Sequence, residues 1–303
     1  MEPWSFQIGS CAMKIWPFYL WSFQIFNTME SRPADFMLWT GDHLYMLNPW
    51  QWTSETEMIK AYKAQRKSKP LANFLKSRPQ YAIWDDHDYG PNNAGLEFEN
   101  KDTARKVFQK MWPQQPQEDQ GIYFHFEHKE ASFFMLDCRY FKIPTNQLLG
   151  EEQMKWLCAA LKNSKSKYNF VVSSIQVHSD GEFESFRNYE KEYKQLLGFI
   201  SENDISGVIF LSGDVHYSEV SRLDRTDDYP LYDFTFSPLT SFPINYFTKN
   251  SYQIDDSKKN RQNFGEISFS GDSSNRICTI RCLTRTNKEL WSYEIPEDAL
   301  RKK

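Results

Sequence analysis

Several absences narrow the classes of protein that this 303-residue chain represents. No apolar run approaches the ~18 residues that a membrane-spanning helix needs. No stripe of Lys and Arg is present, and a net charge of −4 with a pI ≈ 5.9 gives no electrostatic footprint for nucleic acid. The five cysteines are odd in number and form no CxxC pair, which argues against a full disulfide framework. The chain begins Met-Glu-Pro-Trp without a recognisable secretion signal, so the sequence alone leaves the compartment open.

Aromatic residues, in contrast, are abundant. The chain has 24 Phe, 16 Tyr and 10 Trp, together 17% of its residues, which is ample for a large buried core and excludes intrinsic disorder. At roughly 150 residues per domain the length allows one large domain or two small ones. No repeat, low-complexity segment or change in composition marks a boundary, so we expect a single domain over residues 1–303.

Hydrophobic patterning predicts strands that alternate with helices. Short runs rich in Val, Ile and aromatic residues predict buried strands at residues 4–10, 35–39, 81–84, 169–176 and 207–211. Amphipathic patterns predict helices at residues 54–68, 70–76, 101–111, 151–162 and 189–203. We expect a hairpin at 123–127 and 132–137, later strands at 219–223, 231–236, 265–270, 276–283 and 289–295, and surface loops at 114–120 and 245–263. This order predicts an α/β sandwich with a mixed sheet.

Four of the predicted strands end at residues of the types that commonly bind metal ions. In chain order these residues are Cys11, Asp42, Tyr45, Asp85, Asp86, His87, Asp214 and His216. In open α/β sheets, ligands bind beyond the carboxyl ends of the strands. We therefore expect these side chains to meet in one metal site.

Some of these residues also have ordinary structural interpretations. Cys11 alone is typical of a small buried apolar residue, and Asp42 of a helix cap. The segments WDDHD (84–88) and SGDVH (212–216) favour metal binding more strongly. So many carboxylates close together repel one another unless a cation compensates them. His178, near another strand end, is a lesser candidate.

The segments GSC, GDHLY, WDDHDYGPNN, SSIQV and LSGDVHYS occur in the order found in PhoD-like (alkaline phosphatase D) metallophosphoesterases. The chain resembles that family over essentially its whole length. The resemblance implies a calcineurin-like metallophosphoesterase fold, a four-layer α/β/β/α sandwich with mixed sheets. It also implies an extracytoplasmic, periplasmic or secreted location.

The same resemblance implies a dinuclear site with iron and calcium, the second ion being replaceable by another divalent metal. It assigns Cys11, Asp42, Tyr45 and His216 to the iron, with Asp42 bridging. It assigns Asp86 and Asp214 to the second ion, with Asp85 or Asn92 as additional ligands. It places His87 beside the transferred phosphoryl group.

The sequence also departs from the family pattern. Asp88 stands where many relatives have Glu, and we expect no N-terminal β-domain ahead of Cys11. No capping helix is recognisable after Ile295, which leaves the number of calcium ions open.

The ligand chemistry agrees with this assignment. Thiolate and phenolate donors favour a redox-capable ion of high charge, and an all-oxygen site suits a hard ion. Such mixed ligation argues against a structural zinc site. We predict a phosphoric monoester or diester hydrolase in which metal-activated hydroxide attacks phosphorus and His87 or a water protonates the leaving oxygen.

Arg139, in LDCRY, is a candidate either for phosphate binding or for an ion pair with Asp137 or a neighbouring helix. Two alternatives to the predicted function stay open: a dinuclear hydrolase of a non-phosphate ester, and a non-catalytic homologue that binds metal or phosphate. The residues predict a phosphate-ester substrate but neither its identity nor the oligomeric state.

Overall fold

Two six-stranded sheets form the centre of the molecule in the computed structural model, which describes residues 2–113, 121–181, 184–244, 249–272 and 275–302. The first sheet has the order β12-β11-β10-β1-β2-β3. Its strands are β1 (Trp4–Gly9), β2 (Phe36–Thr40), β3 (Gln80–Ile83), β10 (Asn263–Ser270), β11 (Ile277–Thr284) and β12 (Glu289–Pro296). Neighbours among β1, β2 and β3 are parallel, whereas β10, β11 and β12 pair antiparallel, so the sheet is mixed.

The second sheet is also mixed and has the order β4-β5-β6-β7-β9-β8. Its strands are β4 (Phe124–His128), β5 (Ala131–Met135), β6 (Tyr168–Val172), β7 (Val208–Ser212), β8 (Glu219–Leu223) and β9 (Leu231–Thr235). The pairs from β5 through β6 and β7 to β9 are parallel, and the two edge strands are antiparallel.

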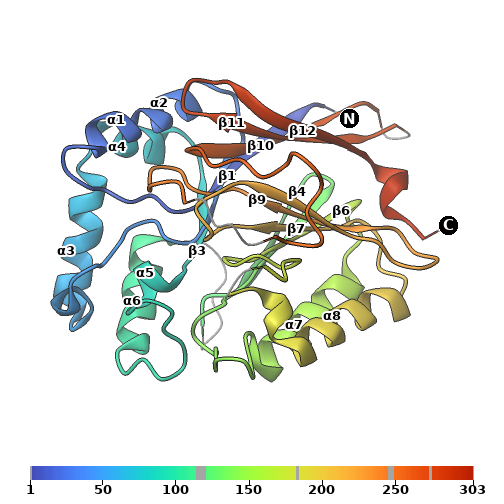
Figure 1. The fold of residues 1–303 in the computed structure, drawn as a ribbon, viewed down its shortest axis with the longest axis horizontal. Helices are drawn as coiled ribbons and strands as arrows, with labels where there is room; N and C mark the ends of the chain where they lie inside the picture. Colours follow the sequence, from blue (N-terminus) through green and yellow to red (C-terminus); the bar gives the residue numbers. More distant parts are fainter. Residues whose placement is uncertain (1, 114–120, 182–183, 245–248, 273–274, 303) are drawn as a thin grey trace.

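Helices cover the outer faces of the two sheets (Figure 1). They are α1 (Tyr19–Ser22), α2 (Gln24–Glu30), α3 (Glu55–Arg66), α4 (Lys69–Ser77), α5 (Asp86–Tyr89), α6 (Lys101–Met111), α7 (Gly150–Asn163) and α8 (Glu190–Glu202). Short 3₁₀ turns lie at Pro49–Trp52, Phe186–Asn188 and Glu297–Leu300. In Figure 1, α7 and α8 lie together at the bottom, and α1, α2 and α4 lie at the upper left. The four-layer α/β/β/α sandwich is confirmed.

An aromatic core holds the two sheets together. The ring of Phe6 on β1 lies 5.1 Å from that of Phe133 on β5 and 5.5 Å from that of Phe170 on β6, centroid to centroid. Because strand side chains alternate between faces, the neighbouring Gln7 points the other way and donates to the carbonyl of Met29 on α2 at 3.0 Å. The abundance of aromatic residues in the sequence thus corresponds to this inter-sheet layer.

The structure corrects two features of the predicted elements. The pattern gave no helix for α1 and α2, because this short aromatic segment has no polar capping residue and buries only Ile25, Phe26 and Met29 of α2. The strand expected at 169–176 ends at Val172, after which the chain turns away as a loop. The loop expected at 114–120 lies outside the described residues, as does part of 245–263.

All five cysteines are buried and unpaired, as expected from the absence of a disulfide pattern. Of the helices in the described ranges, none combines the length and the apolar character that crossing a membrane requires.

Candidate metal centre

The strand ends of the two sheets approach each other closely. The amide of Cys11, after β1, donates to the carbonyl of Gly41, after β2, at 3.3 Å. A Cβ added to Gly41, whose φ is 95°, would lie 2.5 Å from Cβ of Asp85, which follows β3. A Cβ on Gly213, after β7, would lie 2.7 Å from that of Ser10. Glycine is therefore required at Gly41 to bring two loops of the first sheet together, and at Gly213 to bring the loops of the two sheets together.

Four of the predicted ligands have an unusual backbone conformation. The φ angles are 59° for Cys11, 53° for Asp42, 67° for Asp214 and 57° for His216. This left-handed region costs residues other than glycine of the order of 1–3 kcal/mol each, and such strain concentrates at functional sites. Its occurrence at four ligand positions on three separate loops indicates that the surrounding structure holds these side chains in imposed orientations.

The structure brings the predicted ligands into three overlapping groups, each with ligand atoms within 4.8 Å of one another. The groups are Cys11–Asp42–His216, Asp42–Asp86–His87 and Asp42–Asp85–Asp214. Asp42 belongs to all three. A carboxylate shared in this way is placed to bridge two ions, which is the arrangement of a dinuclear centre.

Around Cys11 the remaining donors are positioned by direct contacts. Its Sγ lies 3.7 Å from Oδ2 of Asp42 and 3.2 Å from the carbonyl oxygen of Asp214. Nε2 of His216 lies 2.9 Å from the hydroxyl of Tyr45, and Nδ1 lies 2.9 Å from the carbonyl of Phe242. Because a carbonyl only accepts, Nδ1 carries the proton, and the neutral ring presents the Nε2 lone pair to the site.

The centre gathers buried acidic groups whose charged forms are unfavourable without a nearby cation. Burial raises the pKa of both Asp42 and Asp214 well above the usual range, and the surrounding carboxylates, chiefly Asp86 and Asp85, raise them further. Burial likewise raises the pKa of the Cys11 thiol and the Tyr45 phenol, and it lowers the pKa of His216. A bound cation reverses this penalty for every anionic donor, so the donor set fits metal ions.

Helix α5 presents two further groups. Oδ2 of Asp86 accepts from the amide of Asn93 at 2.7 Å, whereas Oδ1 is buried without a hydrogen-bond partner among the described residues. The backbone amide of His87 donates to Oδ1 of Asp42 at 3.2 Å, and its imidazole lies 4.2 Å from the Tyr45 ring. The unpaired buried oxygen of Asp86 is thus available to an ion.

Arg139 has a different partner from the one expected. Its fully buried guanidinium contacts Asp85 through Nε at 2.6 Å and Nη2 at 2.9 Å, and it contacts Glu184 through Nη1 and Nη2, both at 2.9 Å. The predicted ion pair with Asp137 is wrong, since that carboxylate accepts from the indole of Trp84 and from backbone amides, including that of Arg139 itself. No exposed edge of the guanidinium is left for a phosphate group.

This pairing also occupies Asp85. Its oxygens accept from Arg139 and, at 2.6 Å, from the hydroxyl of Ser174 after β6. Burial raises the pKa of Asp85 to about 6 even though Arg139 lowers it. In Asp86, by contrast, Arg139 and His87 outweigh the effect of burial and hold the pKa below its usual value. Arg139 and Asp85 therefore orient the start of α5.

Two other candidates lie apart from the three groups. His178 is buried beside α8, with Nδ1 2.9 Å from the hydroxyl of Tyr193, and burial lowers its pKa to about 3. Asn92 is exposed in the turn after α5, where the described contact to Asp86 comes from Asn93 instead. Sequence reasoning missed Glu184, since no strand end or motif marks it.

A two-sheet sandwich with these donors at its strand ends defines the class of calcineurin-like metallophosphoesterases. The chain belongs to the PhoD-like phosphatase family, whose profile matches residues 6–277. It is 22% identical over 280 residues to alkaline phosphatase D of Bacillus subtilis (strain 168), an alignment covering 72% of this chain and 47% of the relative. The chain thus spans about half the length of that curated relative.

Solved structures show the same fold. A structure of PhoD is similar with a TM-score of 0.74 and 18% identity, covering 98% of this chain and 69% of that one. The purple acid phosphatase PPD1 from yellow lupin (Lupinus luteus) seeds is similar with a TM-score of 0.68 and 14% identity, covering 97% of this chain and 54% of that one.

Proposed function

We propose that this protein is a metal-dependent phosphoric monoester or diester hydrolase with a dinuclear centre. The observation that carries the proposal is the position of Asp42, which is common to three ligand groups at the ends of β1, β2, β3 and β7. Membership of the PhoD-like phosphatase family supports it.

The donor chemistry supports iron at the first position and calcium or another divalent ion at the second. Cys11, Tyr45 and His216 would hold the iron together with Asp42, and Asp86 and Asp214 would hold the second ion. Asp85 is a weaker ligand candidate because Arg139 and Ser174 occupy its oxygens. Two such ions supply the charge that polarises a phosphoryl group and lowers the pKa of a nearby water.

The chain's own groups would orient the substrate and move protons. The His87 side chain is one-fifth exposed, and its Nε2 lies 4.0 Å from Oδ1 of Asp86, so its ring faces both the centre and solvent. We assign it to the phosphoryl group and the leaving oxygen, where it would donate a proton. The hydrogen bond from the backbone amide of His87 to Asp42 positions the backbone from which the imidazole extends.

Metal analysis combined with a comparison of substrates tests the proposal. Protein purified without chelators should contain two ions per chain and hydrolyse aryl phosphate monoesters or diesters faster than the matching carboxylic ester. Faster hydrolysis of the carboxylic ester would indicate the non-phosphate hydrolase. Full metal content with no hydrolysis of any ester would indicate a non-catalytic homologue. The rate ratio between monoester and diester identifies the preferred substrate class.

We further propose that residues 1–303 act as one catalytic domain and that the protein works outside the cytoplasm. The proposal on location rests on family resemblance. Fractionation of expressing cells tests it, and recovery only in the cytoplasmic fraction would overturn it.

A further inference from the structure

Large apolar side chains are exposed around the candidate metal centre. Nine such side chains in the described part of the chain are more than a third exposed, and seven of them lie on three segments that contact or adjoin predicted ligands. The segment after Cys11 carries Trp16, Phe18, Leu20 and Trp21, which are 53–71% exposed. Leu47 and Trp50 follow Tyr45, and Phe242 accepts a hydrogen bond from His216. We call these seven residues the apolar collar.

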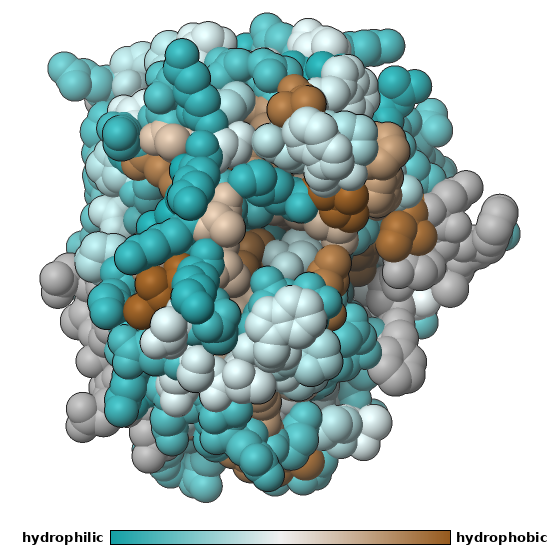
Figure 2. All heavy atoms as spheres, turned by 90° about the vertical axis from the view of Figure 1, so that its left-hand side faces the viewer, coloured by the Kyte–Doolittle hydropathy of each residue, from teal (hydrophilic) through white to brown (hydrophobic). Residues whose placement is uncertain are grey.

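Two observations bring parts of the collar together. The ring of Phe18 lies 5.5 Å from that of Phe242, and Trp16, Tyr45 and Gln51 line one cavity of about 260 Å³. Figure 2, which views the side of the molecule that carries α1 and α3, shows brown hydrophobic side chains gathered at the upper right around a hollow. A soluble monomer rarely exposes so many large apolar residues together without a partner.

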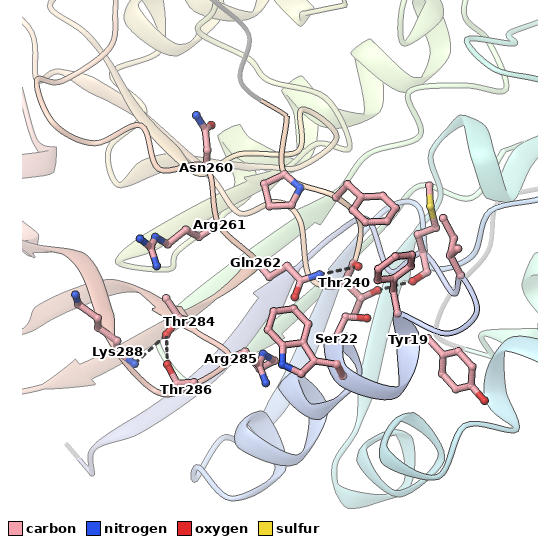
Figure 3. Close-up of a pocket in the computed structure, with 16 residues that line it drawn as sticks. Tyr19, Ser22, Thr240, Asn260, Arg261, Gln262, Thr284, Arg285, Thr286 and Lys288 are labelled. Carbon is pink, nitrogen blue, oxygen red and sulfur yellow. Dashed lines mark hydrogen bonds between the residues drawn. The ribbon is translucent and has the colours of Figure 1, made fainter.

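A cavity of about 410 Å³ (Figure 3) is lined in part by Phe18, Trp21 and Phe242 of the collar. It also shares a wall with the metal centre. Thr240 and Phe242 form that wall. The amide of Thr240 donates to the carbonyl of Cys11 at 3.2 Å, and the carbonyl of Phe242 accepts from Nδ1 of His216. A molecule in this cavity would therefore be separated from the candidate metal ligands Cys11 and His216 by the segment that holds Thr240 and Phe242.

The charged side chains that line the cavity are all cationic. Arg261, Arg285 and Lys288 line it, and none of the described residues that line it is a carboxylate, although the chain as a whole carries a net charge of −4. The guanidinium of Arg285 lies 3.7 Å from the centre of the Trp21 ring, so cation and collar are in direct contact. In Figure 3, Arg261, Lys288, Thr284 and Thr286 gather at one end and Tyr19 lies at the other.

Gln262, between these two ends, adds a polar group that has no partner. Its Nε2 donates to the carbonyl of Thr240 at 2.8 Å, while Oε1 is buried and has no hydrogen-bond partner among the described residues. The cavity thus offers cations for an anion, and the wall residue Gln262 keeps a buried acceptor without a partner among the described residues.

We propose that the apolar collar docks this protein on an anionic lipid surface, with a headgroup phosphate in the cationic cavity. Exposed Trp, Phe and Leu next to Arg and Lys are the combination that binds at the interface of anionic bilayers. Because the chain carries a net charge of −4 while cations line this cavity, an anionic surface favours binding at this face. The proposal goes beyond the proposed function and does not depend on it, because docking needs neither metal nor turnover.

Sedimentation of the full chain with lipid vesicles tests the proposal. We expect the protein to bind vesicles containing phosphatidylglycerol and to bind pure phosphatidylcholine vesicles much more weakly. Replacing Trp16 and Phe18 by Ala should lower the partition coefficient at least about tenfold, because two exposed aromatic side chains no longer insert. The matched control is Leu96→Ala with Ile143→Ala, two exposed apolar residues that the structure places outside the collar, and this variant should bind as the original chain does.

The charge component is tested separately. Arg261→Glu with Lys288→Glu should abolish the preference for phosphatidylglycerol, and unchanged circular dichroism would show that all three double variants fold. Absence of binding to anionic vesicles would overturn the proposal. So would a collar variant that binds like its control, since charge alone would then explain the binding. Saturable binding of another protein to the collar, without vesicle binding, would assign the surface to a protein partner instead.

Discussion

Arg139 offers the sharpest test of how the centre is held together. Its guanidinium makes four contacts of 2.6–2.9 Å to Asp85 and Glu184, wholly out of solvent. Arg139→Met keeps most of the side-chain volume but removes the charge and all four donors. Glu184 would retain the cation of Lys142, whereas Asp85 would lose its cationic partner and keep the hydroxyl of Ser174.

The expected magnitude follows from this imbalance. Removing one partner of a buried ion pair leaves an uncompensated charge and costs about 3–5 kcal/mol. A domain is typically stable by about 5–15 kcal/mol, so the variant should fold but unfold at markedly lower urea concentration. Arg222→Met is the matched control. It removes a pair with Asp224 that is about half exposed on one side and largely exposed on the other, so it should cost less than about 1 kcal/mol.

Urea unfolding at fixed metal concentration, followed by tryptophan fluorescence, measures both effects. Asp85→Asn in the Arg139→Met background should recover part of the loss, because it removes the charge that Arg139 no longer balances. The coupling free energy in this double-mutant cycle should be about 2 kcal/mol. A loss below 1 kcal/mol for Arg139→Met, or a coupling near zero, would refute the reasoning.

Four further predictions concern the centre itself. Asp42→Asn should lose bound metal and activity together while circular dichroism stays unchanged, and full activity would contradict a bridging role. His87→Ala should retain both ions but turn over roughly 10²–10⁴-fold more slowly, and loss of an ion would make His87 a ligand instead. Protein isolated without chelators should be coloured and contain iron, with a visible band that Tyr45→Phe shifts or removes; a colourless, fully active enzyme with zinc or only calcium would exclude iron. In metal-free protein the raised pKa values of Asp42 and Asp214 mean that the folded state binds protons more tightly than the unfolded state. Their contribution to the stability should therefore be largest at pH values below about 4 and fall as pH rises, and added metal should reverse the fall; a loss of stability between pH 5 and pH 8 without metal that is the same in Asp42→Asn as in the original chain would contradict this.

The prediction of the fold from the sequence succeeded where local patterns carry enough information. Short apolar runs predicted buried strands that end close to the same polar residues in the structure, as at Trp39 and Thr40 before Asp42. It failed at α1 and α2, where aromatic residues without caps form helices only because they pack on the first sheet, as Phe26 does against Trp39.

The residues of the metal centre could also be predicted from the sequence, for a related reason. Carboxyl ends of parallel strands share one edge of a sheet, so residues that follow separate strands can be placed together without coordinates. Contacts such as Arg139 with Glu184 follow no such rule. They join loops from different parts of the chain, and neither loop carries a motif.

By itself, the sequence determined which donor atoms exist and that they follow four strand ends. Only the tertiary structure decided how they are shared: Asp42 with every ligand group, Asp85 with Arg139, and His216 with Tyr45 and Phe242. It also decided that the segment after Cys11 exposes its aromatic residues beside Arg285. The physical reason is that local patterning depends on neighbours within a few positions of the sequence. The contacts in the centre depend instead on how the two sheets stack. They also depend on left-handed backbone angles at glycine and at the ligand residues, which the packed core holds in place.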